Sequence, residues 1–211
     1  VNMNVQRDNS SGFLFRIDTV PESGAAIIIL QSAIQPDWEY AFQNAMVLLS
    51  AKPETKKLIL KFRTGESRRF RILVNPVRKV SKNSLDFTGK PFDSKWIGKD
   101  VPVSVTDLPK WLERRAEPLW QATKNSGKSQ SPPGFEIIGI TDIQTGYIRV
   151  NKGTDTSNIR KIRSTKYEGL LRVTNPENFT NTLIKGIGPG KAFGFGLMTV
   201  SQSGHSQADL S

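Results

Sequence analysis

The chain has no cysteine and a single histidine, and these two shortages exclude several kinds of site. Without cysteine it can form neither a disulfide framework nor a thiolate metal site, and the absence suits a cytosolic protein. The one histidine, His205, stands in a polar stretch, SQSGHSQADLS, that is typical of a weakly packed tail. We therefore expect no metal site and no cofactor.

The motifs of several enzyme and membrane classes are also missing. The acidic residues are scattered, with no Asp-x-Asp pair or carboxylate cluster of the kind that holds two metal ions. Neither a Walker A loop nor a nucleophile elbow is present. The longest apolar run, Ala25–Leu30, is too short to span a membrane, and no secretory signal opens the chain. We expect a cytoplasmic protein without a membrane partner.

What the chain has in excess is positive charge. Its 211 residues include 30 Lys and Arg against 19 Asp and Glu, a net charge of +11. Such a balance favours a polyanionic partner, because each phosphate that a cation neutralises releases counterions. Nucleic acid is the first candidate.

Alternating and helical patterns predict an α+β fold in two halves. In the first half we expect an antiparallel pair of strands, Gly12–Asp18 and Ala25–Ser32, and a short helix within Pro36–Ser50. Two further strands are expected over Leu58–Phe62 and Ser67–Pro76. In the second half we expect two helices, Asp107–Glu117 and Asn175–Lys185. Three strands are expected between them, over Phe135–Ile143, Gly146–Val150 and Lys166–Val173, and a last strand over Gly196–Val200.

Both halves fit small sandwiches with helices on one face of an antiparallel sheet. The domain boundaries that follow are an N-terminal domain over residues 1–90, a linker over 91–106, a C-terminal domain over 107–203 and a tail over 204–211.

A basic segment, Ile148–Gly169, is the main candidate for contact with RNA phosphates. Two cationic arms flank a Gly-Thr-Asp-Thr-Ser turn, and a hairpin would bring them together. Arginine adds bidentate contacts to phosphate or guanine. The alternative is a solvated charged loop. The candidate cations are Arg149, Lys152, Arg160, Lys161, Arg163 and Lys166.

A second basic area is RRFRILVNPVRK (Arg68–Lys79), which overlaps the expected strand Ser67–Pro76. There Phe70, Ile72 and Val74 point one way, while Arg69 and Arg71 point the other and form a cationic face. The alternative is a solvated sheet face. The tryptophans could stack on bases, but each is more typical of a core.

Near the C-terminus, KGIGPGKAFGFGLMTV (Lys185–Val200) is rich in glycine. It fits a tight turn that packs a helix on a sheet, or a nest of backbone N–H groups around phosphate, with Gly188, Gly190 and Lys191 as candidates. A dinucleotide fingerprint does not fit, because that motif follows a strand and opens a helix, the reverse of the order expected here.

This glycine-rich segment resembles the C-terminal signature of the CRISPR-associated CasE family, the repeat-processing type of the type I-E system. Four other segments resemble the family in the same order, and the resemblance extends from Gly12 to Val200. They are LQSAIQPDW (Leu30–Trp38), FRILVNPVRK (Phe70–Lys79), KWLERR (Lys110–Arg115) and YEGLLRV (Tyr167–Val173).

The resemblance implies two tandem ferredoxin-like domains and a metal-independent endoribonuclease. Such an enzyme binds the CRISPR RNA repeat hairpin, cuts precursor CRISPR RNA by attack of a ribose 2′-OH, and stays with its product among the other Cascade subunits. The alternative is a non-catalytic RNA-hairpin-binding module or a structural ribonucleoprotein subunit.

The resemblance also implies an N-terminal strand and helix with a catalytic histidine. This chain opens close to the family's second strand, and His205 cannot be matched to that histidine. We assign no catalytic residue. We expect the histidine upstream of Val1, with the first domain incomplete, or an RNA-binding remnant.

Overall fold

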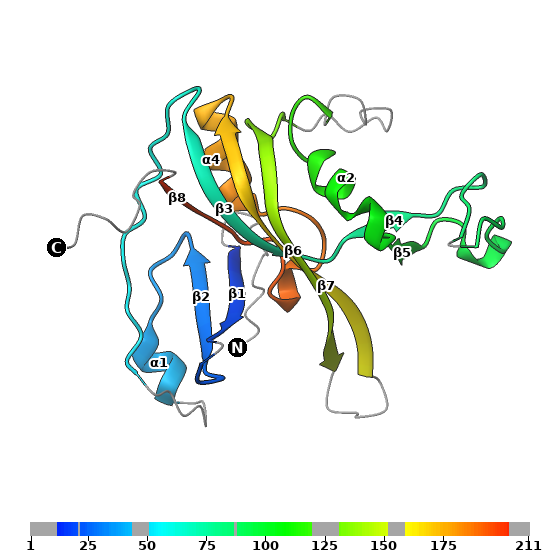
Figure 1. Ribbon diagram of the computed structural model, residues 1–211. Helices are drawn as coiled ribbons and strands as arrows, with labels where there is room; N and C mark the ends of the chain where they lie inside the picture. Colours follow the sequence, from blue (N-terminus) through cyan, green and yellow to red (C-terminus); the bar gives the residue numbers. More distant parts are fainter. Residues whose placement is uncertain are drawn as a thin grey trace, which may run out of the picture.

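The computed structural model describes residues 12–20, 22–43, 51–86, 88–119, 131–151 and 159–202. Figure 1 shows the order of the elements, with α for α-helix and η for 3-10 helix: β1 (Phe13–Thr19), β2 (Ala26–Ser32), α1 (Trp38–Gln43), β3 (Ser67–Val74), β4 (Val77–Lys79), η1 (Ser94–Trp96), β5 (Asp100–Pro102), η2 (Val105–Asp107), α2 (Leu108–Glu113), β6 (Phe135–Asn151), β7 (Ile159–Val173), α4 (Pro176–Lys185), η4 (Lys191–Phe193) and β8 (Met198–Gln202).

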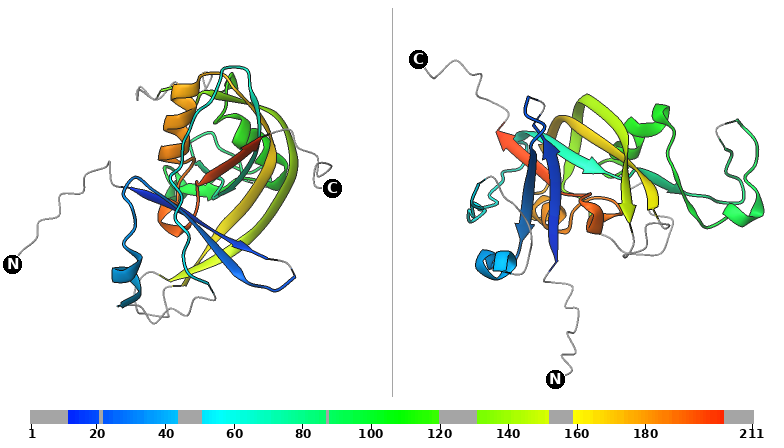
Figure 2. Two further views of the ribbon diagram at one scale, coloured as in Figure 1. Left: turned by 90° about the vertical axis from the view of Figure 1, so that its left-hand side faces the viewer. Right: turned by 90° about the horizontal axis from the view of Figure 1, so that it is seen from below.

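A four-stranded antiparallel sheet forms the centre of the molecule, in the order β6-β7-β3-β8. With α2 between β3 and β6, and α4 between β7 and β8, the chain follows the β-α-β-β-α-β order of a ferredoxin-like unit. Figure 2 shows α4 along one face of this sheet. The α+β class with antiparallel sheets is as expected from the sequence.

The position of β3 differs from the expectation. We assigned this strand to the N-terminal domain over 1–90, but it pairs with β7 and β8, so it belongs to the sheet of the C-terminal unit. Sequence pattern predicts that a strand exists but not its partner, because pairing depends on residues far along the chain. The domain boundaries as a set stay a prediction.

The core lies between this sheet and the two helices. From β3, Phe70, Ile72 and Val74 are buried, as the alternation predicted. Phe179 of α4 packs edge-on against Phe62, with ring centroids 4.8 Å apart. Phe62 lies in the segment Leu58–Phe62, which we expected to be a strand but which has neither helix nor strand.

The β6–β7 hairpin is longer than expected. The two strands predicted over 135–150 are one continuous strand, and β7 begins at Ile159 rather than Lys166. Gly146 does not break β6, since it pairs with Ser164 in regular register. Two register irregularities, at Ile137/Gly139 and Ile140/Asp142, bend the strand instead.

The antiparallel pair β1–β2 forms as expected and lies beside the central sheet (Figure 1). Its apolar face is the exposed one: Phe13 is 58% exposed and Ile17 50%. Leu14 and Arg16, on the opposite face, are buried against the C-terminal unit. Hydrophobic alternation alone would have buried the phenylalanine face.

Candidate nucleic-acid interface

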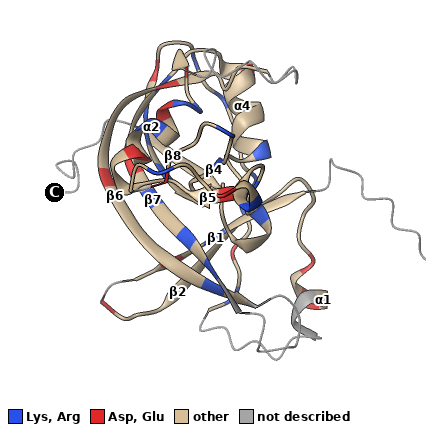
Figure 3. Cartoon of the chain, turned by 90° about the vertical axis from the view of Figure 1, so that its right-hand side faces the viewer, with Lys and Arg blue, Asp and Glu red and all other residues tan. Residues whose placement is uncertain are grey.

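The outer part of the β6–β7 hairpin carries a row of cations on one face. Arg149 of β6 is directly opposite Lys161 of β7, and the next pair on that face is Tyr147 with Arg163. Arg149 and Lys161 are exposed and make no ion pair with any residue that the structure describes. Figure 3 shows Lys and Arg along these strands. This row is the most open cationic surface among the predicted residues.

Arg160 pairs through its backbone with Val150 of β6, and Lys152 lies outside the described residues. Of the predicted set, the hairpin brings Arg149, Lys161 and Arg163 together.

Arg163 is bound within the protein. Its Nη1 donates to the carbonyl of Val103, just after β5, and its Nη2 donates to the hydroxyl of Tyr147 at 3.1 Å. The guanidinium also lies over the Tyr147 ring, 5.7 Å from its centroid. The buried Nε has no partner among the described residues. Arg163 therefore fastens the hairpin to the segment behind β5, a contact that the sequence did not indicate.

The second predicted basic area is largely neutralised. Arg71 pairs with Glu168 at 3.0 Å and lies 3.8 Å from Asp18, and Lys166 pairs with the same Glu168 at 3.2 Å. Arg69, two residues from Arg71 and on the same face, is exposed and has no described partner. This face offers phosphate less free charge than the hairpin does.

The glycine-rich segment forms a close-packed junction. Gly186, Gly188, Gly190, Gly194 and Gly196 all have positive φ, between 70° and 91°. A Cβ on Gly186 would lie 2.8 Å from Leu14 of β1, and one on Gly194 would lie 3.0 Å from Phe15. Only glycine allows β1 to approach this closely.

The Lys191 ammonium is directed back onto this loop. Its Nζ donates to the carbonyl of Gly188 at 3.0 Å, and Gly188 itself faces the ring of Trp111. The packing supports the interpretation as a turn that joins helix to sheet. A phosphate nest at Gly188, Gly190 and Lys191 stays a prediction.

A buried arginine that the sequence did not single out joins the two parts of the molecule. Arg16 is 2% exposed and forms an ion pair with Asp18 at 2.8 Å. Its Nη1 also donates to the carbonyls of Arg71 and Leu197 and to the hydroxyl of Thr199. The sequence pattern that could have indicated this role is the position of Arg16 between Leu14 and Asp18 on one face of β1.

A half-buried arginine packs against the core below the glycine-rich loop. The Arg115 guanidinium lies 3.4 Å from the Trp111 ring centroid and donates to the Trp111 carbonyl at 2.7 Å. Burial lowers the pKa of Arg115 to about 10. Burial likewise raises the pKa of Tyr167, which stacks on the same tryptophan and donates to the carbonyl of Leu108. These contacts stabilise the core, and Tyr167 is fully buried in it.

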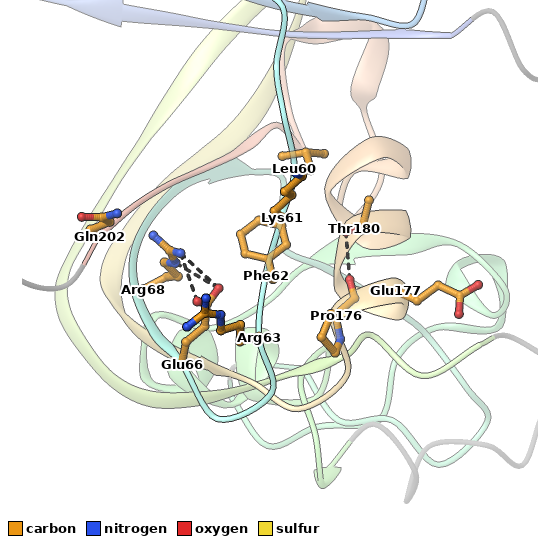
Figure 4. Close-up of a pocket in the computed structure, with 10 residues that line it drawn as sticks. All are labelled: Leu60, Lys61, Phe62, Arg63, Glu66, Arg68, Pro176, Glu177, Thr180 and Gln202. Atoms are coloured by element: carbon orange, nitrogen blue, oxygen red, sulfur yellow. Dashed lines mark hydrogen bonds and ion pairs between the residues drawn. The ribbon is translucent and has the colours of Figure 1, made fainter.

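A cleft with a volume of about 780 Å³ opens on the surface of the described residues (Figure 4). It lies between residues 60–63 and the start of α4, where Arg68 is held by Glu66 at 3.1 Å. Its other polar lining consists of exposed lysine, arginine, glutamate and glutamine and the half-buried Thr180. No histidine or tyrosine lines this cleft.

The described residues contain no group of three or more His, Cys, Asp or Glu side chains placed to hold a metal ion. No described helix is long and apolar enough to cross a membrane.

Comparison with known proteins gives the family. The family of CRISPR-associated proteins matches residues 3–202. The CRISPR-associated endoribonuclease Cse3 of Thermus thermophilus is 26% identical over 188 residues, which cover 89% of this chain and 79% of the relative.

Solved structures agree on the fold. A structure of CRISPR endoribonuclease Cse3 bound to a 19-nucleotide RNA has a TM-score of 0.63 and 24% identity, covering 90% of this chain and 79% of that one. Cas6e of Escherichia coli K-12 has a TM-score of 0.57 and 20% identity, covering 90% and 84%. The chain therefore belongs to the family of CRISPR-associated proteins that its sequence resembles.

Proposed function

We propose that the chain binds the hairpin of a CRISPR repeat RNA and processes precursor CRISPR RNA. The observation that carries the proposal is the exposed pair Arg149 and Lys161 on facing strands of a long hairpin, in a member of this family. Two cations on directly opposite strand positions fit neighbouring phosphates of an RNA backbone. The 26% identical relative is named an endoribonuclease, which supports the same substrate class.

The reaction that fits this chain takes its nucleophile from the RNA. The ribose 2′-oxygen forms a bond to the adjacent phosphorus while the bond from phosphorus to the 5′-oxygen breaks. The 2′-hydroxyl loses its proton and the 5′-oxygen gains one. The protein would position the hairpin and stabilise charge on the phosphate. No residue of this chain is assigned to the proton transfers.

Cleavage of a repeat hairpin in the presence of EDTA tests this proposal. We expect a single cut that persists in EDTA and stops when the scissile nucleotide carries a 2′-deoxy substitution. Cleavage that requires a divalent cation, or that continues on the 2′-deoxy RNA, would contradict the mechanism.

The second candidate is a hairpin-binding module without catalysis. It is favoured by the histidine count, since the sequence has one histidine, His205, which cannot be matched to the family's catalytic histidine. Tight hairpin binding with no cut in the same assay would establish it. In either case we propose a cytoplasmic protein that keeps its RNA and joins other Cascade subunits.

A further inference from the structure

Between β3 and α2 the chain leaves the body of the molecule as a narrow arm, Val77–Pro102, which is separate from the surfaces described above. Figures 1 and 2 show it extending away from the central sheet. It is built on β4 and β5, whose pairing joins Val77 to Pro102. At its base, Trp111 donates from its indole nitrogen to the carbonyl of Val77 at 3.0 Å. The arm is therefore an ordered extension anchored in the core.

The charge of the arm is strongly one-sided. It holds six Lys and Arg against three Asp. Asp86 accepts hydrogen bonds from Thr88 and Lys90, which lower its pKa, and Asp93 pairs with Lys95 at 3.1 Å. Two of the carboxylates are thus committed to the arm's own turns. Four lysines make no ion pair with any described residue: Lys79, Lys82, Lys90 and Lys99.

Aromatic and apolar side chains lie among these cations. Trp96 is 41% exposed, and the Lys99 ammonium lies 5.4 Å from its ring centroid. Ile97, the next residue, is also 41% exposed, and Leu85 is 51% exposed. An exposed indole beside a lysine is the arrangement on which an unstacked base packs while its phosphate meets the ammonium.

We propose that this arm is a binding site for single-stranded RNA, with Trp96 as the stacking residue and Lys99, Lys82 and Lys90 as phosphate contacts. A duplex fits less well, because its bases are already stacked and cannot cover an indole. A protein partner would have to be acidic to match the free lysines. The inference rests on the proposed function for the source of the RNA, a single-stranded segment that flanks the repeat hairpin.

The position of the arm relative to the β6–β7 hairpin supports this source. Arg163 of β7 binds the carbonyl of Val103, the residue that follows the arm. Val103 in turn donates from its backbone N–H to the carbonyl of Pro76, which precedes the arm. The arm and the cationic hairpin therefore start from a shared base, so an RNA held on the hairpin can extend a flank along the arm.

The test compares three RNA probes on the full chain at low and moderate salt. They are a repeat hairpin alone, the same hairpin with a single-stranded extension on either side, and a short oligouridine. We expect the extension to tighten binding about tenfold, the contribution of a stacked base. Trp96→Ala should abolish this gain and weaken oligouridine binding, while affinity for the bare hairpin stays unchanged. Trp96→Phe, which keeps an aromatic face, should retain most of the gain.

The exposed lysines provide a second variant that does not touch the arm's packing. Lys82→Ala with Lys90→Ala should lower the salt dependence of oligouridine binding by about 0.7 per lysine in the log–log slope. Lys56→Ala, an exposed lysine outside the arm, is the matched control and should change nothing. Thermal unfolding confirms that each variant is folded.

The outcomes separate this inference from the proposed function. If neither the wild type nor any variant binds the repeat hairpin, the proposed function is wrong. Oligouridine binding then still shows whether the arm is an RNA-binding site. If the Trp96→Ala variant and the variant with both Lys82→Ala and Lys90→Ala bind extended RNA and oligouridine as the wild type does, the arm is not an RNA-binding site. Unchanged RNA affinity together with loss of a protein from the assembled complex would likewise overturn it and assign the arm to a protein partner.

Discussion

The guanidinium of Arg16 donates a hydrogen bond of 3.3 Å to the backbone carbonyl of Leu197, at the exit of the glycine-rich segment. The two residues are 181 positions apart, and the bond is buried. With the ion pair to Asp18, it ties the β1–β2 hairpin to β8. Together with the packing of Leu14 and Phe15 on the glycine-rich segment, Arg16 thus holds the N-terminal hairpin on the C-terminal unit.

Replacing this arginine should destabilise the fold. Arg16→Leu leaves Asp18 with Arg71 at 3.8 Å and removes the donor to the buried carbonyl of Leu197, so we expect a loss of about 3 kcal/mol in the free energy of unfolding. Urea denaturation measures it. Arg63→Ala removes an exposed arginine and should stay within about 0.5 kcal/mol of the wild type. Equal midpoints for the two variants would show that Arg16 does not hold the hairpin in place.

The glycine-rich segment should tolerate no side chain where β1 approaches it. Gly194 has φ +83°, and a Cβ there would lie 3.0 Å from Phe15, so Gly194→Ala should cost about 1–2 kcal/mol of unfolding free energy. Gly146→Ala is the control, since that position has no heavy atom within 4 Å of the added methyl. Thermal unfolding compares them, and a Gly194→Ala protein as stable as the control would contradict the close-packed junction.

Local sequence chemistry predicted the parts of this fold that local forces decide. The burial of Phe70 and Ile72 follows from the alternation of β3. The start of α4 follows from Asn175, whose side chain accepts from the N–H of Asn178, and its end from Gly186 with φ +70°. Each of these signals lies within a few residues of the feature that it predicts.

Features that depend on distant residues were missed. The alternation in β1 predicts two faces but not which of them is buried. The face with Leu14 and Arg16 is buried because Leu14 packs on Gly186 and Arg16 bonds to the carbonyl of Leu197. Both partners lie far along the chain from β1. For the candidate site, the sequence predicted a cluster of cations in the segment Ile148–Gly169. It could not show that Arg163 would be bound to Val103.

The hairpin cations should therefore separate into binding and structural residues. Arg149→Ala and Lys161→Ala remove exposed side chains, so each should weaken repeat-hairpin binding and reduce the log–log salt slope by about 0.9 while leaving stability unchanged. Arg163→Ala should instead lower the unfolding free energy by about 1–2 kcal/mol, because the bonds to Val103 and Tyr147 are lost.

Fluorescence anisotropy with labelled repeat RNA and urea denaturation on the same samples make this comparison. Lys56→Ala, a solvent-exposed lysine far along the chain from the hairpin, controls for net charge. If Arg149→Ala and Lys161→Ala bind RNA with the affinity and salt slope of Lys56→Ala, the hairpin is not the phosphate-binding surface.

Tyr167 should make the protein less stable in alkali. Its phenol is fully buried and donates to the carbonyl of Leu108 at 2.9 Å, and burial raises its pKa above the ordinary value of 10.0. Above that pH the unfolded chain releases this proton while the folded chain keeps it. The unfolded state then binds fewer protons, so the free energy of unfolding falls by about 1.4 kcal/mol per pH unit from this residue, and below it the residue adds no slope.

Tyr167→Phe should remove that alkaline slope. At neutral pH it should cost about 1 kcal/mol, because the hydrogen bond to Leu108 is lost. The wild type is the more stable protein at neutral pH, but only the wild type loses stability through this residue as the pH rises. The unfolding free energies of the variant and the wild type should therefore converge above pH 10.0. Tyr147→Phe, at a tyrosine that is 61% exposed, removes the acceptor of one Arg163 hydrogen bond, so it serves as a control for the shape of the pH curve and not for its height. Urea denaturation at a series of pH values measures all three, and parallel curves for Tyr167→Phe and the wild type would show that the buried phenol keeps no proton that the unfolded chain loses.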